Sequence, residues 1–393
     1  MAFIIEYLIH AELSLASYAT LSVGFPAIDE LKRNAVGRAS VQAQFFAERY
    51  TVLAQYNGEV VRDYVDEFGH PQQFTDQTGL SATLFSDVTG NRFVAIRGTQ
   101  MGDGNDLITD LASIVTLGTT RFQAQYAALK ARIDQWLTDP AMLQGKNFTV
   151  AGHSLGGFLA GGLMMDMGSR IDHAYLYNAP GVGGVGDVAG YLARVGEYLG
   201  IANRSADATR ISNIVGSEGL SLVAGIGSPL SPQVTIQMEA QANPLDNHSV
   251  VVLTDALAVH DLLARTDSTV SIDAIGGLVK AASNKYADTL EALTGALGGV
   301  LLGTPTAIAP GDRDGLYQAI HNIRRLLDSG PQPPRTFVPL TEVSAADLAT
   351  AAANPDGIAT RYALKELNPF ALLGANYGRF NAAGELDLYD PAT

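Results

Sequence analysis

The sequence predicts an α/β fold in which helices flank a mostly parallel central sheet. Between residues 80 and 265, short apolar runs typical of buried strands alternate with longer segments of helical spacing. A helical segment also separates the strands predicted at 92–99 and 148–151, and a strand, a crossover helix and a strand form a right-handed parallel unit. A third signal is residues 147–157, NFTVAGHSLGG, which predict a strand, a tight turn and a helix.

Composition places the chain among globular proteins. Its 393 residues are 47% hydrophobic and 17% charged, enough for one large domain with an appendage or for two domains. The net charge of −15 and the pI of about 4.8 argue against nucleic-acid binding and against simple adsorption to anionic membranes. The chain has no cysteine, which excludes disulfides and thiol chemistry but does not identify the compartment.

The N-terminal residues predict an amphipathic helix. Glu6 and Glu12 interrupt the apolar pattern and no basic segment precedes it, so we expect no cleavable signal peptide. The protein is then either cytoplasmic or secreted without such a peptide. Two uncharged windows, 219–238 and 292–311, reach membrane-spanning length but contain proline. We expect lid or pocket-wall segments there, or plain core and loop, and no transmembrane span.

The first half of the chain predicts helices followed by a hairpin. Residues 1–60 have helical character, clearest at 46–56, and strands are predicted at 80–87 and 92–99 around a turn at 87–91. An amphipathic segment follows at 106–115. A longer helix is predicted at 120–137, where apolar residues recur at helical spacing: Phe122, Tyr126, Leu129, Ile133 and Leu137.

The rest of the first 265 residues continues the alternation of strands and helices. After the strand at 148–151, the predicted elements are helices at 158–167, 187–199 and 250–265, and strands at 171–180, 209–216 and 234–239. Residues 269–303 are helical and strongly apolar on one side, and proline-rich loops follow. We therefore expect one domain at 1–265 and a mainly helical region at 266–393. That region would be either a cap over the pocket or an appendage that buries a flank of the sheet.

The pattern Gly152-His153-Ser154-Leu155-Gly156 is that of a nucleophile elbow. A serine at the tip of a tight strand-to-helix turn has a strained backbone, so the residues two before and two after it must be small. The turn would expose the Ser154 hydroxyl above the sheet edge. The amide of Leu155, at the helix N-terminus, could donate to a developing oxyanion.

A second oxyanion donor is predicted at Thr99. The strand at 92–99 ends in Arg-Gly-Thr and leads into a polar loop at 100–106. In open α/β sheets, ligands bind at the carboxyl edge of the strands, where such an ending presents a backbone N–H and a hydroxyl. Thr99 and Leu155 together would form the oxyanion hole.

Candidates for the base and the acid follow later in the chain. His248 lies in a polar loop at a helix start, whereas His260, the alternative base, lies in the apolar body of that helix. Glu218 comes just after the strand at 209–216, where the acid belongs when the order is serine, acid, histidine. Asp246, two residues before His248, and Glu239, at the end of a predicted strand, remain alternatives for the acid.

In this order, the motifs resemble the class 3 lipase family, the fungal-type lipases and their bacterial relatives. The resemblance covers about residues 80–265 and depends on FVAIRGTQ, DLITDL, FTVAGHSLGG and LYNAPGVGG, then a strand followed by an acid, and an Asn-His pair. It implies an α/β-hydrolase fold, a mobile lid and hydrolysis of lipid esters, with Ser154 as nucleophile and Thr99 and Leu155 as oxyanion donors. The sequence departs from the family at Glu218, because the family normally has aspartate there.

The implied activity is that of a carboxylic ester hydrolase, a lipase or an esterase. His248 would take the proton of Ser154, and Glu218 would hold the imidazole during formation of an acyl-enzyme. Neither a metal nor an organic cofactor is needed, and Asp103, Asp106 and Asp110 lack calcium-loop spacing. The expected partner is a lipid or other ester substrate, met at a lipid–water interface. Phospholipase A1 activity, feruloyl esterase activity and a catalytically inactive binding module remain alternatives.

Overall fold

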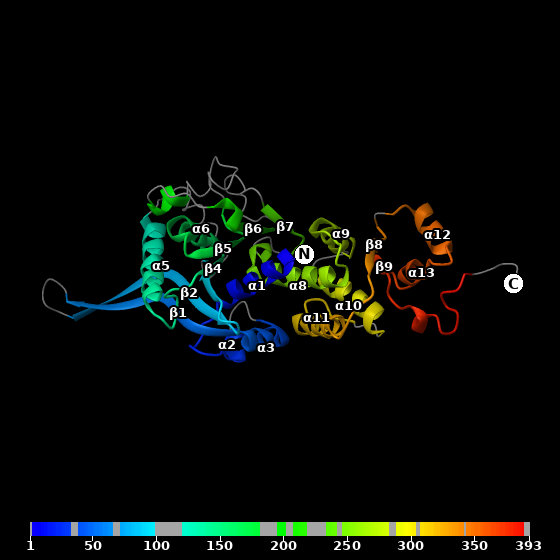
Figure 1. Cartoon of the computed structure of the whole chain (residues 1–393), viewed down its shortest axis with the longest axis horizontal. Coiled ribbons are helices and arrows are strands. Elements are labelled where there is room, and N and C mark those ends of the chain that lie inside the picture. The colour runs from blue at the N-terminus through cyan, green and yellow to red at the C-terminus, as the bar shows by residue number, and fades with distance from the viewer. Residues whose placement is uncertain are drawn as a thin grey trace. The chain divides into compact units, whose positions relative to one another are not determined.

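The computed structural model describes most of the chain (Figure 1). Residue contacts divide it into two compact units. The sheet unit consists of Ile9–Thr235 and Pro244–Thr254, and the helical unit of Met1–Leu8, Ile236–Asn243 and Asp255–Thr393. The described residues are 2–32, 38–65, 71–98, 120–180, 195–201, 207–217, 233–241, 246–282, 288–303, 307–341 and 343–388.

A seven-stranded sheet forms the centre of the sheet unit, and its strands follow the order of the chain. The pairs β1–β2 and β2–β3 are antiparallel, whereas β3–β4, β4–β5 and β5–β6 are parallel. Only β2 therefore opposes the other strands from β1 to β6, which confirms the predicted α/β class with its mostly parallel sheet. The strands are β1 (Tyr50–Val65), β2 (Pro71–Asp87), β3 (Arg92–Arg97), β4 (Phe148–His153), β5 (Ile171–Tyr177), β6 (Ile211–Gly216) and β7 (Gln233–Ile236).

Helices cover both faces of this sheet. The crossover helices α5 (Thr120–Thr138) and α6 (Leu155–Met167) pack in one apolar cluster with Leu84 and Ile96. Because successive right-handed crossovers to adjacent strands place their helices on the same face, α5 and α6 share it. The neighbouring residues Phe85 and Ala95 point to the opposite face, as strand alternation requires. There they pack with α1 (Ala2–Ala16), α2 (Ile28–Lys32) and α3 (Ser40–Arg49).

The helix predicted at 46–56 is wrong beyond Arg49. From Tyr50 the chain is strand β1, which pairs with β2 along a long two-stranded ribbon (Figure 1). The segment Tyr-Thr-Val-Leu that opens β1 has aromatic and β-branched residues, which favour strands. Cross-strand pairing such as Val52 with Phe85 decides the outcome, and local spacing cannot reveal that partner.

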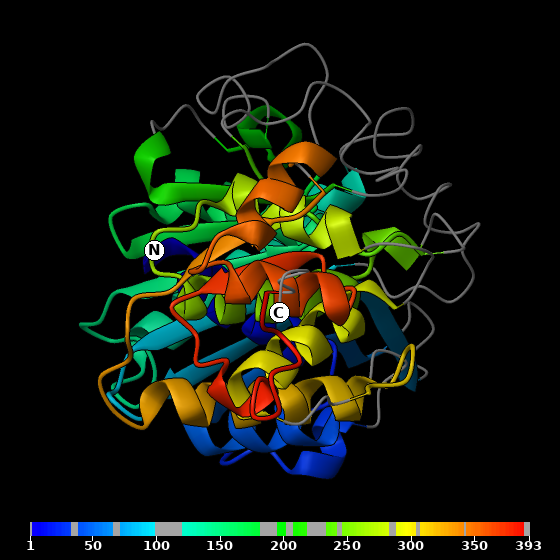
Figure 2. The same ribbon diagram turned by 90° about the vertical axis from the view of Figure 1, so that its right-hand side faces the viewer.

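The helical unit contains a short two-stranded antiparallel sheet, β8 (Thr336–Pro339) with β9 (Phe370–Leu373), in the part of the chain drawn in orange to red in Figure 2. Its helices include the part of α8 (Val250–Thr266) from Asp255 onward, together with α9 (Ile272–Ala282), α10 (Thr289–Leu302), α11 (Arg313–Asp328), α12 (Ala345–Ala353) and α13 (Ile358–Lys365). The boundary predicted at residue 265 and the role of a cap stay predictions.

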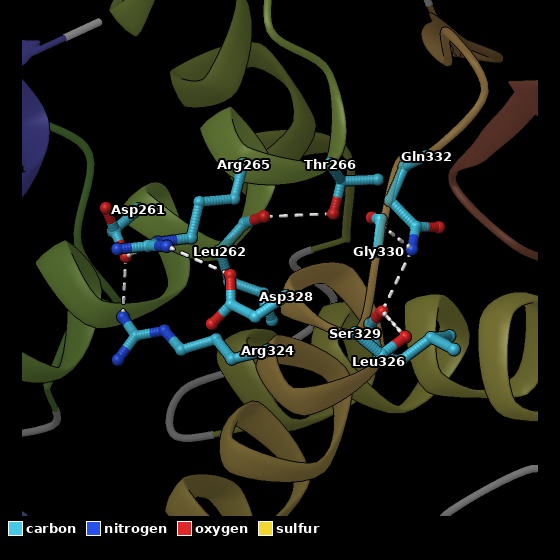
Figure 3. A network of polar contacts seen from close by, with 10 residues as sticks. All are labelled: Asp261, Leu262, Arg265, Thr266, Arg324, Leu326, Asp328, Ser329, Gly330 and Gln332. Carbon is cyan, nitrogen blue, oxygen red and sulfur yellow. Dashed lines mark hydrogen bonds and ion pairs between the residues drawn. The ribbon is translucent and has the colours of Figure 1, made fainter.

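A buried carboxylate joins α8 to α11 within the helical unit (Figure 3). Asp261 is 3% exposed, and its Oδ2 accepts hydrogen bonds from Arg265 Nε and Arg324 Nη2, both at 2.7 Å. Arg265 also lies 3.7 Å from the carboxylate of Asp328. One charge on α8 is thus shared by two guanidinium groups, one of them on α11.

In the described part of the chain, no helix combines the length and the apolar character that crossing a membrane requires.

Candidate active site

The turn at Ser154 has the strained backbone that its sequence predicts. Ser154 has φ 56° and ψ −128°, a backbone conformation that residues other than glycine rarely adopt. A Cβ atom on Gly152 would lie 2.2 Å from the Gly156 carbonyl oxygen, and one on Gly156 would lie 2.1 Å from the Ile96 carbonyl oxygen. Both positions therefore require glycine, because the strand, the turn and the helix are in backbone contact.

The hydroxyl of Ser154 is buried at the start of α6. The residue is 3% exposed, and its amide donates to the Tyr177 carbonyl oxygen at 2.8 Å. Its Oγ hydrogen-bonds to none of the described residues. Helix α6 begins at Leu155, and the first amides of a helix have no acceptor within the helix. The Leu155 amide is the first of this helix, and its role as an oxyanion donor stays a prediction.

His248 ends a short 3₁₀ turn, Asp246–His248, and is 1% exposed. Neither ring nitrogen hydrogen-bonds to a described residue. Burial, with a smaller effect from the neighbouring His153, lowers the pKa of His248 well below its usual value. The imidazole is therefore neutral at pH 7 and can accept a proton.

His153 connects His248 to the serine turn. Its Nε2 lies 2.7 Å from the carbonyl oxygen of His248, and its Nδ1 lies 2.8 Å from the Tyr18 hydroxyl. Since a carbonyl only accepts, Nε2 must carry the proton, and Nδ1 then accepts from Tyr18. Burial lowers the pKa of His153 to about 4, which favours this neutral form. The ring centroids of His153 and His248 are 4.9 Å apart, so His248 lies beside the residue that precedes Ser154.

Asn178 ties His248 to the end of β6. This residue is 1% exposed and has φ 44°, in the left-handed region that asparagine tolerates. Its Nδ2 makes a long contact of 3.5 Å to the His248 carbonyl, and its Oδ1 accepts from the Gly216 amide at 2.9 Å. The sequence motif LYNAP marked Asn178, whereas Tyr18 had no local signal because it lies 135 residues from His153.

Thr99 and Glu218 lie outside the described residues, so their roles stay predictions. The chain just before each of them is described. A Cβ on Gly98 would lie 3.0 Å from Ser154 Cβ, so the strand leading to Thr99 passes beside the serine. Gly216, two residues before Glu218, is connected to His248 through Asn178.

The alternative acids and the alternative base have other surroundings. Asp246 is exposed, and neither nitrogen of His248 accepts from or donates to its carboxylate. The Glu239 carboxylate accepts from the Leu290 amide at 2.8 Å. His260 is buried in α8, where its Nδ1 donates to the Ala256 carbonyl at 2.8 Å, as a packed helix residue would.

Within the described ranges, no three histidine or acidic side chains are grouped as a metal ion would require. Asp103, Asp106 and Asp110 fall outside those ranges. Comparison of the chain with protein-family models and with curated proteins found no match.

Proposed function

We propose that this protein is a carboxylic ester hydrolase in which Ser154 is the nucleophile and His248 the general base. The observation that carries the proposal is a pair of buried groups with no hydrogen-bond partner among the described residues, the Ser154 hydroxyl and the His248 imidazole. Buried polar groups are nearly always hydrogen-bonded, and exceptions often mark catalytic sites. These two groups belong to one site, because His153, next to Ser154, hydrogen-bonds to the main chain of His248.

The proposed reaction proceeds through an acyl-enzyme. His248 takes the proton as Ser154 attacks the ester carbonyl, and then gives it to the leaving alcohol. The amides of Leu155 and Thr99 stabilise the oxyanion, and losing one such donor usually costs about 2.7–4 kcal/mol. Water then releases the acid by the same steps. We propose Glu218 as the acid that orients the imidazole, and a lipid or other ester as the substrate.

We further propose that the fold is that of an α/β-hydrolase of the class 3 lipase type. Two features support this: a strained serine between strand β4 and helix α6, and a sheet whose strands β3 to β6 are parallel and in chain order. A glycine pair that only the strand-turn-helix contact explains adds to the support.

The proposal is tested by the hydrolysis of p-nitrophenyl esters from acetate to palmitate. We expect Ser154→Ala and His248→Ala each to lower kcat/KM by about 10⁴-fold or more, since triad members act as a unit. Ser329→Ala, at an exposed serine that ends helix α11, is the matched control and should leave the rate unchanged. Hydrolysis that survives in Ser154→Ala would contradict Ser154 as the nucleophile, and no hydrolysis of any ester by the wild type would favour an inactive binding module.

The chain-length profile also separates the substrate classes. A rise in rate above the solubility limit of long-chain esters would indicate a lipase with a lid, whereas an optimum at acetate or butyrate would indicate an esterase. Phospholipid and feruloyl esters, assayed in the same way, test for phospholipase A1 activity and feruloyl esterase activity.

A further inference from the structure

A cavity of about 650 Å³ lies within the helical unit, formed by α9, α10, α13 and the segment after β8. Its volume is typical of sites for small organic molecules, which range from about 300 to 1,000 Å³. The residues of the proposed ester site, Ser154 and His248, belong to the sheet unit and do not line it. The cavity is therefore separate from the proposed ester site.

Small residues of α10 open this cavity. Ala292, Gly295, Ala296 and Gly299 recur along one side of the helix and line the space. Without longer side chains, the helix backbone itself forms the wall. Leu364 and Leu367 also line the cavity and are 41% and 89% exposed. An apolar group entering the cavity would therefore contact methyl groups, methylene groups and exposed leucine.

A buried carboxyl group also lines this space. Glu291 is 4% exposed; its Oε1 accepts from the Gly311 amide at 3.2 Å, and its Oε2 is buried without a donor among the described residues. Glu239 is within hydrogen-bonding reach of Glu291. Burial, with the neighbouring Glu239 adding to it, raises the pKa of Glu291 to about 7. Two acidic groups in such contact need either a shared proton or a cation.

We propose that this cavity binds a small organic ammonium ion with an alkyl body, and that Glu291 accepts its N–H hydrogen bonds. The charge of the lining favours a cation, because it includes Glu291 and Glu366, while none of the described lining residues is Lys or Arg. A hard metal ion would need six or more oxygen ligands, and most of these lining residues are apolar. The ammonium group of an alkylammonium ion matches the carboxylates of the site, and its alkyl chain matches the apolar lining.

The test measures the binding of n-hexylamine, 1-hexanol and hexanoate to the full chain by calorimetry at pH 7. Spectra of protein labelled at alanine methyl groups locate the ligand, because Ala292 and Ala296 line the cavity. We expect hexylamine to bind most tightly and to shift these methyl signals. Glu291→Gln, which keeps the size of the side chain, should weaken hexylamine by about tenfold or more, the range for a charged hydrogen bond.

Two further variants keep the result interpretable. Ala296→Phe fills the cavity without altering its charge and should abolish binding, which covers the case in which Glu291→Gln fails to fold. Glu48→Gln, at an exposed glutamate of α3, should bind as the wild type does. Hexanol binding as tightly as hexylamine, equal hexylamine affinity in Glu291→Gln, or no binding to the wild type would each overturn the proposal. These results are independent of ester hydrolysis, which Ser154→Ala tests separately.

Discussion

Tyr18, His153 and the main chain of His248 form a chain of hydrogen bonds next to Ser154, and we expect this chain to position His248 as the proposed base. His153 donates to the main chain of His248, and Tyr18 fixes the tautomer that makes this possible. In the proposed mechanism neither Tyr18 nor His153 touches the substrate, so we expect both to act as positioning residues. Their effect on catalysis should therefore depend on geometry and leave substrate affinity nearly unchanged.

Replacing Tyr18 by Phe tests this role. The variant leaves Nδ1 of His153 buried without a donor, which usually costs about 1–3 kcal/mol of stability. We expect kcat for ester hydrolysis to fall by about tenfold, the size of a 1.4 kcal/mol change, with KM little altered.

Tyr198→Phe is the matched control, since the Tyr198 hydroxyl has no part in this chain of hydrogen bonds. Steady-state kinetics at pH 7 and thermal unfolding check both variants. An unchanged kcat in Tyr18→Phe would show that the hydrogen bond to His153 does not position the base.

At the scale of elements, the junction of β4 and α6 depends on backbone contact. Gly152 and Gly156 let the strand, the turn and the helix approach more closely than any side chain allows. This contact forces the left-handed conformation of Ser154. The geometry of the proposed nucleophile is thus a property of the junction and not of the serine alone.

Gly156→Ala should destabilise the sheet unit by more than about 3 kcal/mol, because its Cβ would lie 2.1 Å from a backbone oxygen. Gly145→Ala is a matched control: Gly145 has φ +70° and nothing within 4 Å of an added Cβ. That change should cost only about 1 kcal/mol. Urea unfolding measures both, and equal losses would contradict the contact argument.

In the helical unit, the link between α8 and α11 depends on Asp261. Asp261→Ala removes a buried carboxylate that accepts charged hydrogen bonds from two partly exposed arginines, so we expect a loss of about 1.5–3 kcal/mol. Asp328→Ala removes an exposed member of the same network and should cost less than about 1 kcal/mol. Urea unfolding measures both losses of stability. Comparable losses from the two variants would show that the burial of Asp261 does not determine the size of the loss.

Elements with strong local patterns were predictable from the sequence. The helix expected at 120–137 is α5, Thr120–Thr138, because its apolar residues recur at a helical period. The hairpin turn at 87–91 was equally clear, and the Asp87 carboxylate accepts there from the amides of Thr89 and Asn91, both at 2.9 Å. Strand β1 was missed because its pairing with β2 is non-local.

At the site too, features set by local sequence were predictable, and features set by non-local contacts were not. Spacing around Ser154 predicted the strained turn, which a local glycine pattern determines. Tyr18 could not be predicted, since its contact with His153 exists only once the chain has folded. Asn178 had a motif, but its role as a bridge between β6 and His248 needed coordinates.

At the scale of the whole molecule, buried ionisable groups give stability a net dependence on pH. Burial lowers the pKa of His153 and His260 to about 4 and that of His248 well below its usual value. The stability from these neutral groups is fully present above about pH 6.5 and is lost as the pH falls toward 4. Glu291 has the opposite effect on the pH dependence of stability, because its raised pKa gives stability that is lost as the pH rises from about 4.5 through 7.

We therefore expect the thermal midpoint to fall between pH 7 and pH 4.5, since the histidines with a lowered pKa outweigh Glu6, Glu239 and Glu291, the glutamates with a raised pKa. The shifts of His153, His260 and Glu291 each correspond to about 3 kcal/mol. Glu291→Gln removes one of the opposing contributions, so its midpoint should fall more steeply over this range than that of the wild type. Differential scanning calorimetry at a series of pH values checks this, and a shallower fall in the variant would contradict it.

The reactivity of Ser154 is tested most directly by intact mass spectrometry after treatment with a fluorophosphonate. We predict one adduct per chain, located on the peptide that contains Ser154, absent in Ser154→Ala and formed far more slowly in His248→Ala. No adduct on the folded wild type, or an adduct that persists in Ser154→Ala, would contradict the account.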